Sequence, residues 1–515
     1  MSLKKVKNKT LRALLENLIT IPGIAAVFFL VLILATAGNY GFFGDELYYF
    51  ACSKHLAWGY VDQPPMVAFL TFVSTKIFGE TMFSLRLISG LAGAITILLS
   101  ARITEILGGN KFAQSLSAIS ICCALAFLAL SSFFSMNPVD ILLCTLFVLL
   151  FISTINEPTK TKWIGLAIIF GAGLLNKYTF LVLGFSLFIS LIITRRWSVL
   201  KSPWFYFSGA AGFLIFLPHI LWQINHGWPT LEFMHNATEY KNLSLSPLAF
   251  FIQLTISLNP FTLPIWISGL LYLLLNKNGQ KFRFLGWTAV IFLFIYLIQN
   301  SKVYYVVPIF PLLFSAGSIA AERFLFKFKV KWPRWVMVAV VIVSGTILMP
   351  LAVPVLPVKQ FVVYAKTFGL WNLIRMEKGE GDVLPLHFVY RLGWKELVNI
   401  VGNTFKALPQ NERDSCAVLA SWYGIAGAID HYGPKIGLPY AICPRNNYWL
   451  WGPRNYSGNT VLAVGYNADY LRKFFNRVKQ VAHFDQQYAY GTDIYLCKEP
   501  KAKLHEMWPK LKLFI

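Results

Sequence analysis

Apolar runs of about 20 residues recur along the chain up to Pro354, and this pattern restricts what the chain can fold into. A helix of about 20 residues crosses the ~30 Å hydrocarbon core of a bilayer. The chain is 56% hydrophobic and only 13% charged, whereas soluble domains carry about 25% charged residues. A membrane β-barrel would show shorter alternating segments. The sequence therefore predicts a polytopic α-helical membrane protein.

Hydropathy over windows of about 20 residues predicts about 11 transmembrane helices, within a range of about 10 to 13. They cover residues 18–38, 84–107, 112–132, 140–155, 163–176, 179–194, 204–224, 249–275, 284–299, 303–320 and 335–353. The fifth and sixth segments are short and are compatible with a broken pair around Asn176 and Lys177. The first run lacks a small-residue cleavage pattern, so we interpret it as a signal anchor.

The net charge of +23 is distributed in a way that indicates orientation. In a soluble protein such a charge would suggest nucleic acid, but here basic clusters fall in the N-terminus and in alternate short loops, so we expect no nucleic-acid partner. The positive-inside rule then places the N-terminus in the cytoplasm. With an odd number of spans, the C-terminal region lies outside. We expect a multi-pass protein of the bacterial inner (plasma) membrane.

Two domains are predicted. Residues 1–354 form a transmembrane module with a first outer loop at 39–83, and residues 355–515 form an extracytoplasmic α/β domain. In the latter, GWKELVNIVGNTFKAL has helical periodicity, while CAVLAS, NTVLAVG and DIYLC are typical of short buried strands. Whether Cys416, Cys443 and Cys497 form a disulfide is left open.

Acidic side chains cluster in the first outer loop. Only 11 Asp and Glu residues occur up to Pro354, and Asp45, Glu46 and Asp62 fall in this one loop. Acids are costly near hydrocarbon, so the cluster indicates a polar reaction chamber at the membrane surface. Asp45 is a candidate base that accepts a proton from a hydroxyl or amine. Its alternative role is a helix N-cap, and Asp62 is equally compatible with capping a turn.

Asp140 is the second acidic position, at the entrance of the fourth span. Pro138 favours a helix start there, which would place Asp140 in a first turn, where the helix dipole stabilises a carboxylate. Structural and functional roles for Asp140 both stay open. Lys177 and Lys302 stand at span ends, where a lysine either extends harmlessly to the interface or holds a phosphate.

Arg86 opens the second span, and its guanidinium geometry suits bidentate phosphate contact. His219 and Trp222 are possible polar contacts, although an interfacial histidine is commonly just packed. The sequence contains no G-x-x-x-x-G-K-[ST] and no strand-linked G-x-G-x-x-G, so no nucleotide cofactor is expected. An outward-facing site would need an activated substrate that arrives already linked to lipid.

An ordered set of motifs resembles the bacterial members of glycosyltransferase family 39, relatives of protein O-mannosyltransferases and of the lipid A aminoarabinose transferase. The motifs are GDELYYFACSKHLAWGYVDQPPMVAFL, FSLRLISGLAG, MNPVDILLCTLF, GLLNKYTFLVL, PHILWQINHGWPTLEF, NSKVYYVVPIFPLL and YGIAGAIDHYGPKIGLPYAICPRNNYWLWGP. They span most of the chain. The resemblance implies a GT-C fold and transfer of a sugar from a polyprenyl-phosphate carrier, with inversion at the anomeric carbon.

The resemblance also implies roles for individual residues. Asp45 matches the catalytic acid of the first loop. The supporting or acceptor-binding positions are Glu46, Tyr49, Asp62 and Asp140; the donor-phosphate positions are Arg86, Lys177, Lys302, Tyr304 and Tyr305. One departure is Asp62-Gln63, where the aminoarabinose transferases have Glu-Lys before Pro-Pro. This departure leaves open the identity of the donor and the use of a divalent metal.

The expected partners are a polyprenyl-phosphate-linked sugar, a lipid or glycan acceptor such as lipid A or lipopolysaccharide, and membrane lipid. Protein O-glycosylation is an alternative acceptor reaction, and a polymerase of wall or O-antigen glycans is another. From a different class, a membrane transporter would also hold acids and broken helices, but as two repeated halves near the bilayer midplane. A purely structural membrane protein would not explain the clustered acids.

Overall fold

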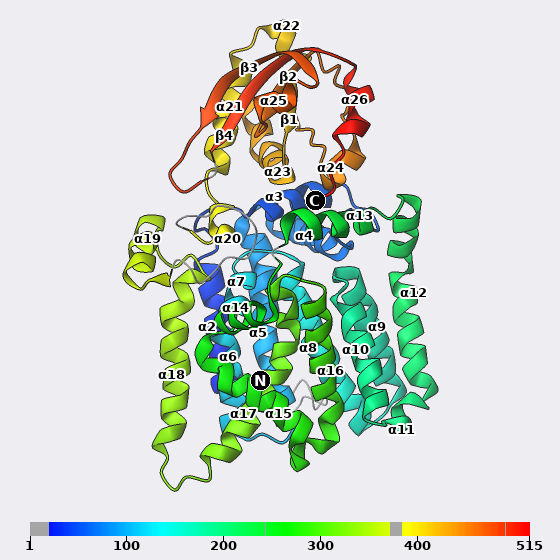
Figure 1. Ribbon diagram of the computed structural model, residues 1–515, viewed down its shortest axis with the longest axis vertical. Helices are drawn as coiled ribbons and strands as arrows, with labels where there is room; N and C mark the ends of the chain where they lie inside the picture. The colour runs from blue at the N-terminus through cyan, green and yellow to red at the C-terminus, as the bar shows by residue number, and fades with distance from the viewer. Residues whose placement is uncertain (1–19, 243, 371–383, 490) are drawn as a thin grey trace. The chain divides into compact units, whose positions relative to one another are not determined.

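The computed structural model describes residues 20–242, 244–370, 384–489 and 491–515 (Figure 1). The chain forms two compact units. The bundle unit comprises residues 1–39, 85–220 and 242–376, and the sheet unit comprises residues 40–84, 221–241 and 377–515. Each unit is therefore assembled from three segments of the chain, and the sheet unit includes both the first loop and the C-terminal region. The contiguous domain division at residue 354 stays a prediction.

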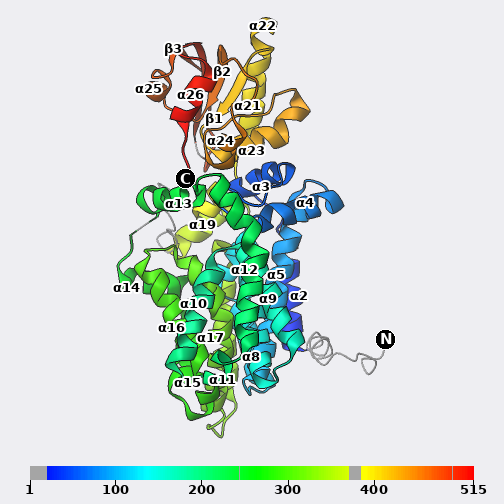
Figure 2. The same ribbon diagram turned by 90° about the vertical axis from the view of Figure 1, so that its right-hand side faces the viewer.

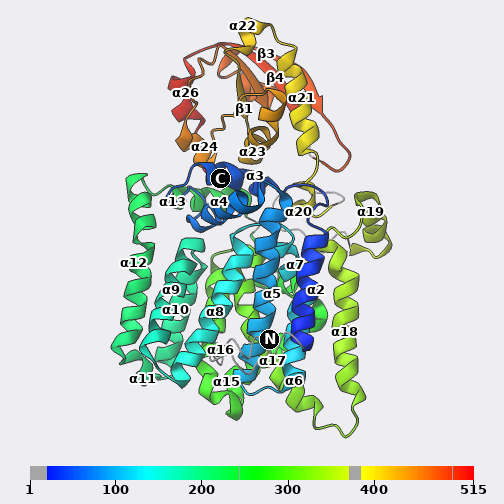
Figure 3. The same ribbon diagram turned by 180° about the vertical axis from the view of Figure 1, so that it is seen from behind.

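Helices, most of them apolar, build the bundle unit. They are α2 (Ile21–Ala35), α5 (Met82–Ile106), α6 (Lys111–Cys122), α7 (Leu125–Ser131), α8 (Met136–Asn156), α9 (Lys160–Asn176), α10 (Thr179–Ile193), α11 (Trp197–Leu200), α12 (Pro203–Asn225), α14 (Pro247–Ser257), α15 (Leu263–Leu275), α16 (Arg283–Ile298), α17 (Phe310–Leu325), α18 (Trp332–Leu348) and α19 (Val358–Thr367). Helix α17 packs against α15 and α6, α10 against α16, and α8 against α9. Figure 3 shows α2, α5 and α8 with their long axes roughly aligned.

Two glycines let α15 and α17 approach closely. A Cβ added at Gly317 would lie 1.8 Å from the carbonyl oxygen of Ile265, and one at Gly269 would lie 2.1 Å from that of Leu313. Hydrogen atoms at these two positions therefore allow backbone-to-backbone contact, as is common where membrane helices pack through small residues.

Six helical segments among the described residues are long and apolar enough to cross a membrane, at 82–106, 136–156, 203–225, 277–298, 303–325 and 332–351. The number rises to eight if each of two bent helix pairs is one span. Every predicted segment coincides with a helix or a helix pair, but α9 and α10 have only 17 and 15 residues, short for a ~30 Å core. The count of eleven spans stays a prediction.

Two predicted spans are bent. Residues 249–275 fall on α14 and α15, which meet at 99°. The break lies at Asn259, whose φ is +70°, and Pro260, which has no amide hydrogen to donate. Helices α6 and α7 meet at 57° between Cys122 and Leu125. Hydropathy does not detect either bend, because the side chains on both sides of it are equally apolar.

A four-stranded sheet organises the C-terminal part of the sheet unit. Strands β1 (Ala417–Ala420), β2 (Thr460–Val464), β3 (Phe475–Phe484) and β4 (Thr492–Pro500) lie in the order β1-β2-β4-β3. The β1–β2 pair is parallel, with Val418 opposite Leu462, and the other pairs are antiparallel. The strands predicted at CAVLAS, NTVLAVG and DIYLC are confirmed as β1, β2 and β4. Edge strand β3 was not predicted, because its FNRVKQVAHF sequence is largely exposed.

Short helices complete the sheet unit. They are α3 (Gly44–Lys54), α4 (Met66–Phe78), α13 (Pro229–Asn236), α20 (Leu386–Val389), α21 (Trp394–Lys406), α22 (Gln410–Arg413), α23 (Tyr423–Tyr432), α24 (Asn446–Trp451), α25 (Ala468–Leu471) and α26 (Leu504–Leu511). The helix predicted at GWKELVNIVGNTFKAL is confirmed as α21. Leu504, Met507 and Trp508 of α26 pack on one sheet face, and α21 contacts β2 and β3. Figure 2 shows α26 and α21 on opposite sides of the sheet.

All seven cysteines are free, including Cys416, Cys443 and Cys497. These three side chains are buried in the sheet unit, where they pack as small apolar residues.

Candidate active site

The first loop is helical at the acidic cluster. Helix α3 begins at Gly44, and the backbone N–H of Phe43 donates a 2.8 Å hydrogen bond to Oε2 of Glu46, whose side chain is fully buried. Glu46 therefore closes the N-terminus of α3 in the manner of a capping-box glutamate. The N-cap role considered for Asp45 is wrong, since Phe43 occupies the N-cap position.

Asp45 lies in the first turn of α3 and faces a residue from the far end of the sequence. The hydroxyl of Tyr423, at the start of α23, donates a 3.2 Å hydrogen bond to Oδ1 of Asp45. A donor of this kind favours the ionised carboxylate, the form that accepts a proton. The Asp45 side chain is thus held in one orientation by a neutral partner.

Hydrogen bonds link Asp62 to Tyr48 of α3 and, through Tyr48, to Asn447 of α24. The hydroxyl of Tyr48 donates a 3.0 Å hydrogen bond to Oδ1 of Asp62, and the N–H of Asn447 donates to the Tyr48 oxygen at 3.3 Å. The side-chain oxygen of Asn447 in turn accepts the N–H of Val61 at 2.6 Å. These bonds fix the loop that carries Asp62 by contacts with the C-terminal region.

Burial changes the acid–base properties of this cluster. Burial raises the pKa of Asp62 to about 7; the charge of Asp45 adds to the increase, while the Tyr48 hydrogen bond and the charge of Lys241 oppose it. The pKa of Tyr49 is raised well above its usual value, first by burial and then by the charges of Asp45 and Asp62. Tyr49 therefore stays protonated, and both predicted carboxylates act on it.

Gln63, the position that departs from the family pattern, is fully buried. Neither its amide nitrogen nor its amide oxygen has a hydrogen-bond partner among the described residues. A buried amide without partners is costly, and the neutral Gln63 supplies no positive charge.

A second cluster lies in the bundle unit, around Lys177. Lys177 follows the last residue of α9, and its Nζ donates a 2.8 Å hydrogen bond to Oδ1 of Asn137 and lies 3.8 Å from Oδ2 of Asp140. Its Nζ also lies 4.4 Å from the ring centroid of Tyr305 and 5.7 Å from that of Tyr304.

Lys302 joins this cluster through Tyr304, since its Nζ lies 6.0 Å from that ring centroid. The structure therefore brings together four of the five predicted donor-phosphate residues: Lys177, Lys302, Tyr304 and Tyr305. The side chain of Lys177 is only 13% exposed, so it does not extend freely to an interface. Aromatic rings beside a cation stabilise its charge while leaving N–H donors available.

Asp140 has a different structural context from the one predicted. Helix α8 begins at Met136, where Oγ of the N-cap Ser135 accepts the N–H of Asn137, so Asp140 lies beyond the first turn. The helix-dipole explanation is therefore wrong. Asp140 is fully buried, and its charge is balanced by Lys177 instead, as a buried carboxylate requires.

The remaining predicted residues have other partners. Arg86 is fully buried in α5, and its guanidinium donates to the carbonyl oxygen of Ala37. Nε2 of His219 lies 2.7 Å from the hydroxyl of Tyr178, next to Lys177 in the chain. In the sheet unit, Trp222 stacks on His226 with ring centroids 4.1 Å apart.

Among the described residues, no group of three or more His, Cys, Asp or Glu side chains is arranged to hold a metal ion. Asp45 and Asp62 supply two carboxylates near Tyr49 but no third ligand of these types.

Sequence reasoning missed Tyr423, Asn447 and Asn137, although Tyr423 and Asn137 contact predicted residues and Asn447 contacts Tyr48, the partner of Asp62. Tyr423 and Asp45 are 378 positions apart in sequence, and Asn447 and Val61 are 386 apart. Their motifs, YGIAG and CPRNNYW, were noted only as part of the family resemblance. Asn137 lies in the quoted MNPVD motif, but nothing in its spacing indicated that it would hold Lys177.

A family model described as dolichyl-phosphate-mannose-protein mannosyltransferase matches residues 62–222. The lipid A galacturonosyltransferase RgtD of Rhizobium johnstonii is 23% identical over 322 residues, which are 60% of this chain and 66% of that protein.

Two crystal structures of ArnT from Cupriavidus metallidurans share the fold. The structure bound to undecaprenyl phosphate has a TM-score of 0.61 at 13% identity, and the apo structure has 0.62 at 14%. Each alignment covers 92% of this chain and 97% of ArnT. The helical bundle with a small C-terminal sheet is therefore an ArnT-like arrangement.

Proposed function

We propose that this chain is a GT-C glycosyltransferase that moves a monosaccharide from a polyprenyl-phosphate carrier to an acceptor outside the cytoplasm. We propose lipid A, lipopolysaccharide or another envelope glycan as the acceptor. The name of RgtD, which specifies lipid A, supports this acceptor class, and the undecaprenyl phosphate bound to ArnT supports the donor carrier. The observation that carries the proposal concerns the Asp45 carboxylate. It lies in the first turn of α3 and accepts a hydrogen bond from the hydroxyl of Tyr423.

Asp45 is proposed as the general base. It would take the proton from the acceptor hydroxyl or amine while the acceptor atom bonds to the anomeric carbon from the side opposite the phosphate. The bond between the anomeric carbon and the phosphate oxygen breaks, its electron pair leaves on that oxygen, and the anomeric centre inverts. A positioned base contributes about 10²- to 10⁴-fold, and alignment of the two substrates supplies further acceleration.

The Lys177 cluster is proposed to bind the carrier phosphate. The leaving group gains negative charge, and a preorganised cation stabilises it. Asn137 and Asp140 hold Lys177, and the rings of Tyr304 and Tyr305 flank it. Lys302 would add a second cation. We propose that Asp140 acts through Lys177 and that the role of Arg86 is to support the start of the second span.

Asp62 and Glu46 receive different proposed roles. With a pKa of about 7, Asp62 is partly protonated near neutral pH and could donate a hydrogen bond to the acceptor as well as accept one. Glu46 is proposed as a capping residue rather than an acceptor ligand, because its carboxylate accepts the Phe43 N–H. Tyr49, held protonated beside both acids, could donate its hydroxyl hydrogen to substrate.

A protein hydroxyl is the second candidate acceptor. It is favoured by the description of the matching family model, a protein mannosyltransferase. Transport is less well supported. The bent pairs α6–α7 and α14–α15 are a feature of transporters, but the likeness to ArnT over 92% of the chain favours a transferase.

Mass spectrometry of envelope lipids, glycans and proteins tests the proposal. A strain lacking the gene is compared with the same strain carrying the wild-type gene or Asp45→Asn at equal protein level. Loss of one sugar mass from a lipid or glycan, restored only by wild type, is expected and would identify sugar and acceptor. A sugar lost only from proteins would favour the second candidate, and no change in any fraction would contradict glycosyl transfer.

A further inference from the structure

Helices α3 and α23 of the sheet unit pack against each other. At one end, the hydroxyl of Tyr423 meets the carboxylate of Asp45 at 3.2 Å. At the other end, the ring of His431 stacks on Phe50, with centroids 5.1 Å apart and an interplanar angle of 11°. The C-terminal region thus contributes a helix that packs directly against the acid-bearing helix.

Gly427 sets the separation of the two helices. A Cβ added there would lie 2.7 Å from the carbonyl carbon of Leu47 and 2.9 Å from the amide nitrogen of Tyr48. Those atoms are backbone and cannot rotate away, so any side chain at position 427 must push α23 from α3. Gly427 lies one helical turn after Tyr423, so such a shift would move the tyrosine hydroxyl away from Asp45.

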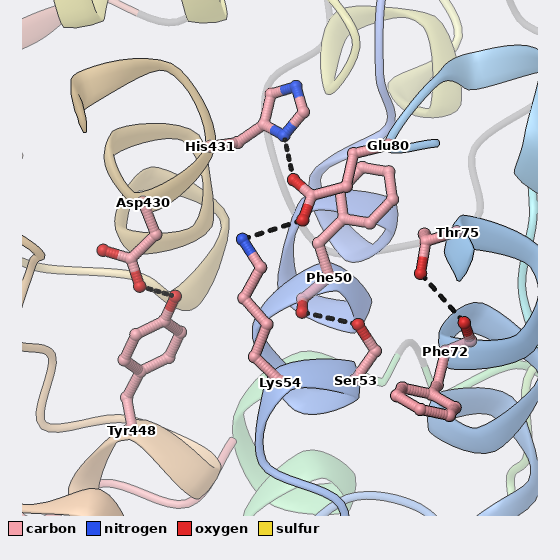
Figure 4. A network of polar contacts seen from close by, with 9 residues as sticks. All are labelled: Phe50, Ser53, Lys54, Phe72, Thr75, Glu80, Asp430, His431 and Tyr448. Atoms are coloured by element: carbon pink, nitrogen blue, oxygen red, sulfur yellow. Dashed lines mark hydrogen bonds and ion pairs between the residues drawn. The ribbon is translucent and has the colours of Figure 1, made fainter. Parts of the chain in front are cut away.

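A charged bridge fixes the far end of the pair (Figure 4). Oε2 of Glu80 lies 3.1 Å from Nδ1 of His431, and Oε1 of Glu80 lies 2.9 Å from Nζ of Lys54, near the end of α3. The hydrogen bond with His431 is the main cause that lowers the pKa of Glu80 to about 2, so Glu80 stays ionised. Glu80 therefore links His431 of α23 to Lys54 of α3.

Asp430, next to His431, anchors α23 to the C-terminal region that follows it in sequence. Its Oδ1 accepts the N–H of Ala441 at 2.7 Å, and its Oδ2 accepts the hydroxyl of Tyr448 at 2.8 Å. The Tyr448 ring stacks on that of Tyr48 in α3, with centroids 6.1 Å apart. The position of α23 is thus determined at its start, its middle and its end.

We propose that Tyr423 is a positioning residue for the transfer reaction: α23 is aligned on α3 by Gly427 and the His431–Glu80–Lys54 bridge, so that the Tyr423 hydroxyl holds the Asp45 carboxylate toward the acceptor. The inference rests on the proposed role of Asp45 as general base. It assigns to the C-terminal region a direct part in the active site. Tyr423 acts only through its hydrogen bond to Asp45.

Steady-state transfer by purified full-length protein tests the inference. The enzyme is reconstituted in total lipid extract of the strain lacking the gene, which supplies donor and acceptor, and the sugar-mass gain is followed from pH 5 to 9. Tyr423→Phe should lower kcat about 10-fold, the effect of losing one hydrogen bond to a charged group, with the half-saturating extract concentration unchanged. The acidic limb of its pH profile should move to higher pH, because the carboxylate loses a donor that favours its ionised form.

Gly427→Ala extends the test to the alignment itself. It should lower kcat and move the acidic limb in the same direction as Tyr423→Phe, while changing no group that touches Asp45. Gly209→Ala in α12 is the matched control, because a Cβ there meets nothing within 4 Å, and it should behave as wild type. Thermal unfolding monitored by tryptophan fluorescence confirms that each variant is folded.

The outcomes separate the two claims. Wild-type kcat and pH profile in Tyr423→Phe, with Asp45→Asn inactive, would overturn the positioning role and leave the proposed function standing. A Gly427→Ala enzyme that is folded and fully active would overturn the alignment by α23. No transfer by the wild-type enzyme, or full activity of Asp45→Asn, would overturn the proposed function itself.

Discussion

The ammonium group of Lys177 lies 3.8 Å from the carboxylate of Asp140, with the carboxylate fully buried and the lysine side chain 13% exposed. A buried charge that loses its partner is strongly destabilising, by about 3–5 kcal/mol. The pair therefore fixes a cation at a defined place in the bundle unit, between Asn137 and the two tyrosine rings.

Replacing Lys177 by Met should weaken binding of undecaprenyl phosphate at least about 10-fold, because a charge-assisted contact to phosphate is lost. The measurement is a titration of the purified protein with undecaprenyl phosphate, followed by native mass spectrometry. Lys162→Met in α9 is the control, since Lys162 pairs with the exposed Glu157. Equal affinities of Lys177→Met and wild type would contradict the phosphate role.

Asp62 should make stability depend on pH. Its pKa rises from 3.8 unfolded to about 7 folded, so its contribution to stability is complete below pH 3.8 and is lost as the pH rises through about 7. The loss is at most about 4 kcal/mol. The wild type should therefore unfold at lower temperature at pH 8.5 than at pH 5.5, and Asp62→Asn should reduce this difference.

The comparison uses thermal unfolding followed by tryptophan fluorescence, with Asp485→Asn as the control for an exposed acid. An undiminished pH difference in Asp62→Asn would show that Asp62 does not titrate in this range. Asp430, whose pKa burial raises to about 6, would then be the next group to replace.

Glu46→Gln should keep transfer activity within about twofold of wild type, because glutamine also serves as the last residue of a capping box. Glu46→Ala removes the acceptor for the Phe43 N–H and should lower the free energy of unfolding by about 1 kcal/mol. The measurements are transfer rate and thermal unfolding of the two variants. Loss of activity in a well-folded Glu46→Gln protein would instead assign Glu46 a role toward substrate.

The orientation of the chain can be tested by thiol labelling. All native cysteines are free, and six of the seven are buried, so background labelling should be low. Lys479→Cys in β3 and Lys327→Cys between α17 and α18 replace exposed residues. A membrane-impermeant maleimide should label position 479 in intact spheroplasts and position 327 only after permeabilisation. The reverse pattern would invert the predicted topology.

Hydropathy located the helices because lipid-facing and core-facing positions are both apolar in this chain. All eleven predicted segments coincide with helices, and three strands and α21 follow the expected periodicity. The bend at Asn259 escaped notice because it depends on one positive φ and one proline. The course of β3 escaped notice because an exposed edge strand carries no apolar alternation.

Local patterns named Asp45 and Lys177, and the family resemblance named Tyr304 and Tyr305, but neither indicated which residues hold them. Tyr423 reaches Asp45 across 378 positions of sequence, and no periodicity connects residues so far apart. For Asp140, the local sequence pattern led to the wrong explanation. Its place near a helix start suggested a dipole effect, whereas its burial beside Lys177 explains it better.

The most direct test of the account compares purified wild type with Asp45→Asn in the same lipid extract, with equal folding verified by thermal unfolding. Asparagine keeps the size of the side chain and its ability to accept the Tyr423 hydrogen bond, but it cannot take up a proton. The account predicts a loss of sugar transfer of at least about 10²-fold, with undecaprenyl phosphate binding unchanged. Wild-type transfer by Asp45→Asn would contradict the general-base assignment.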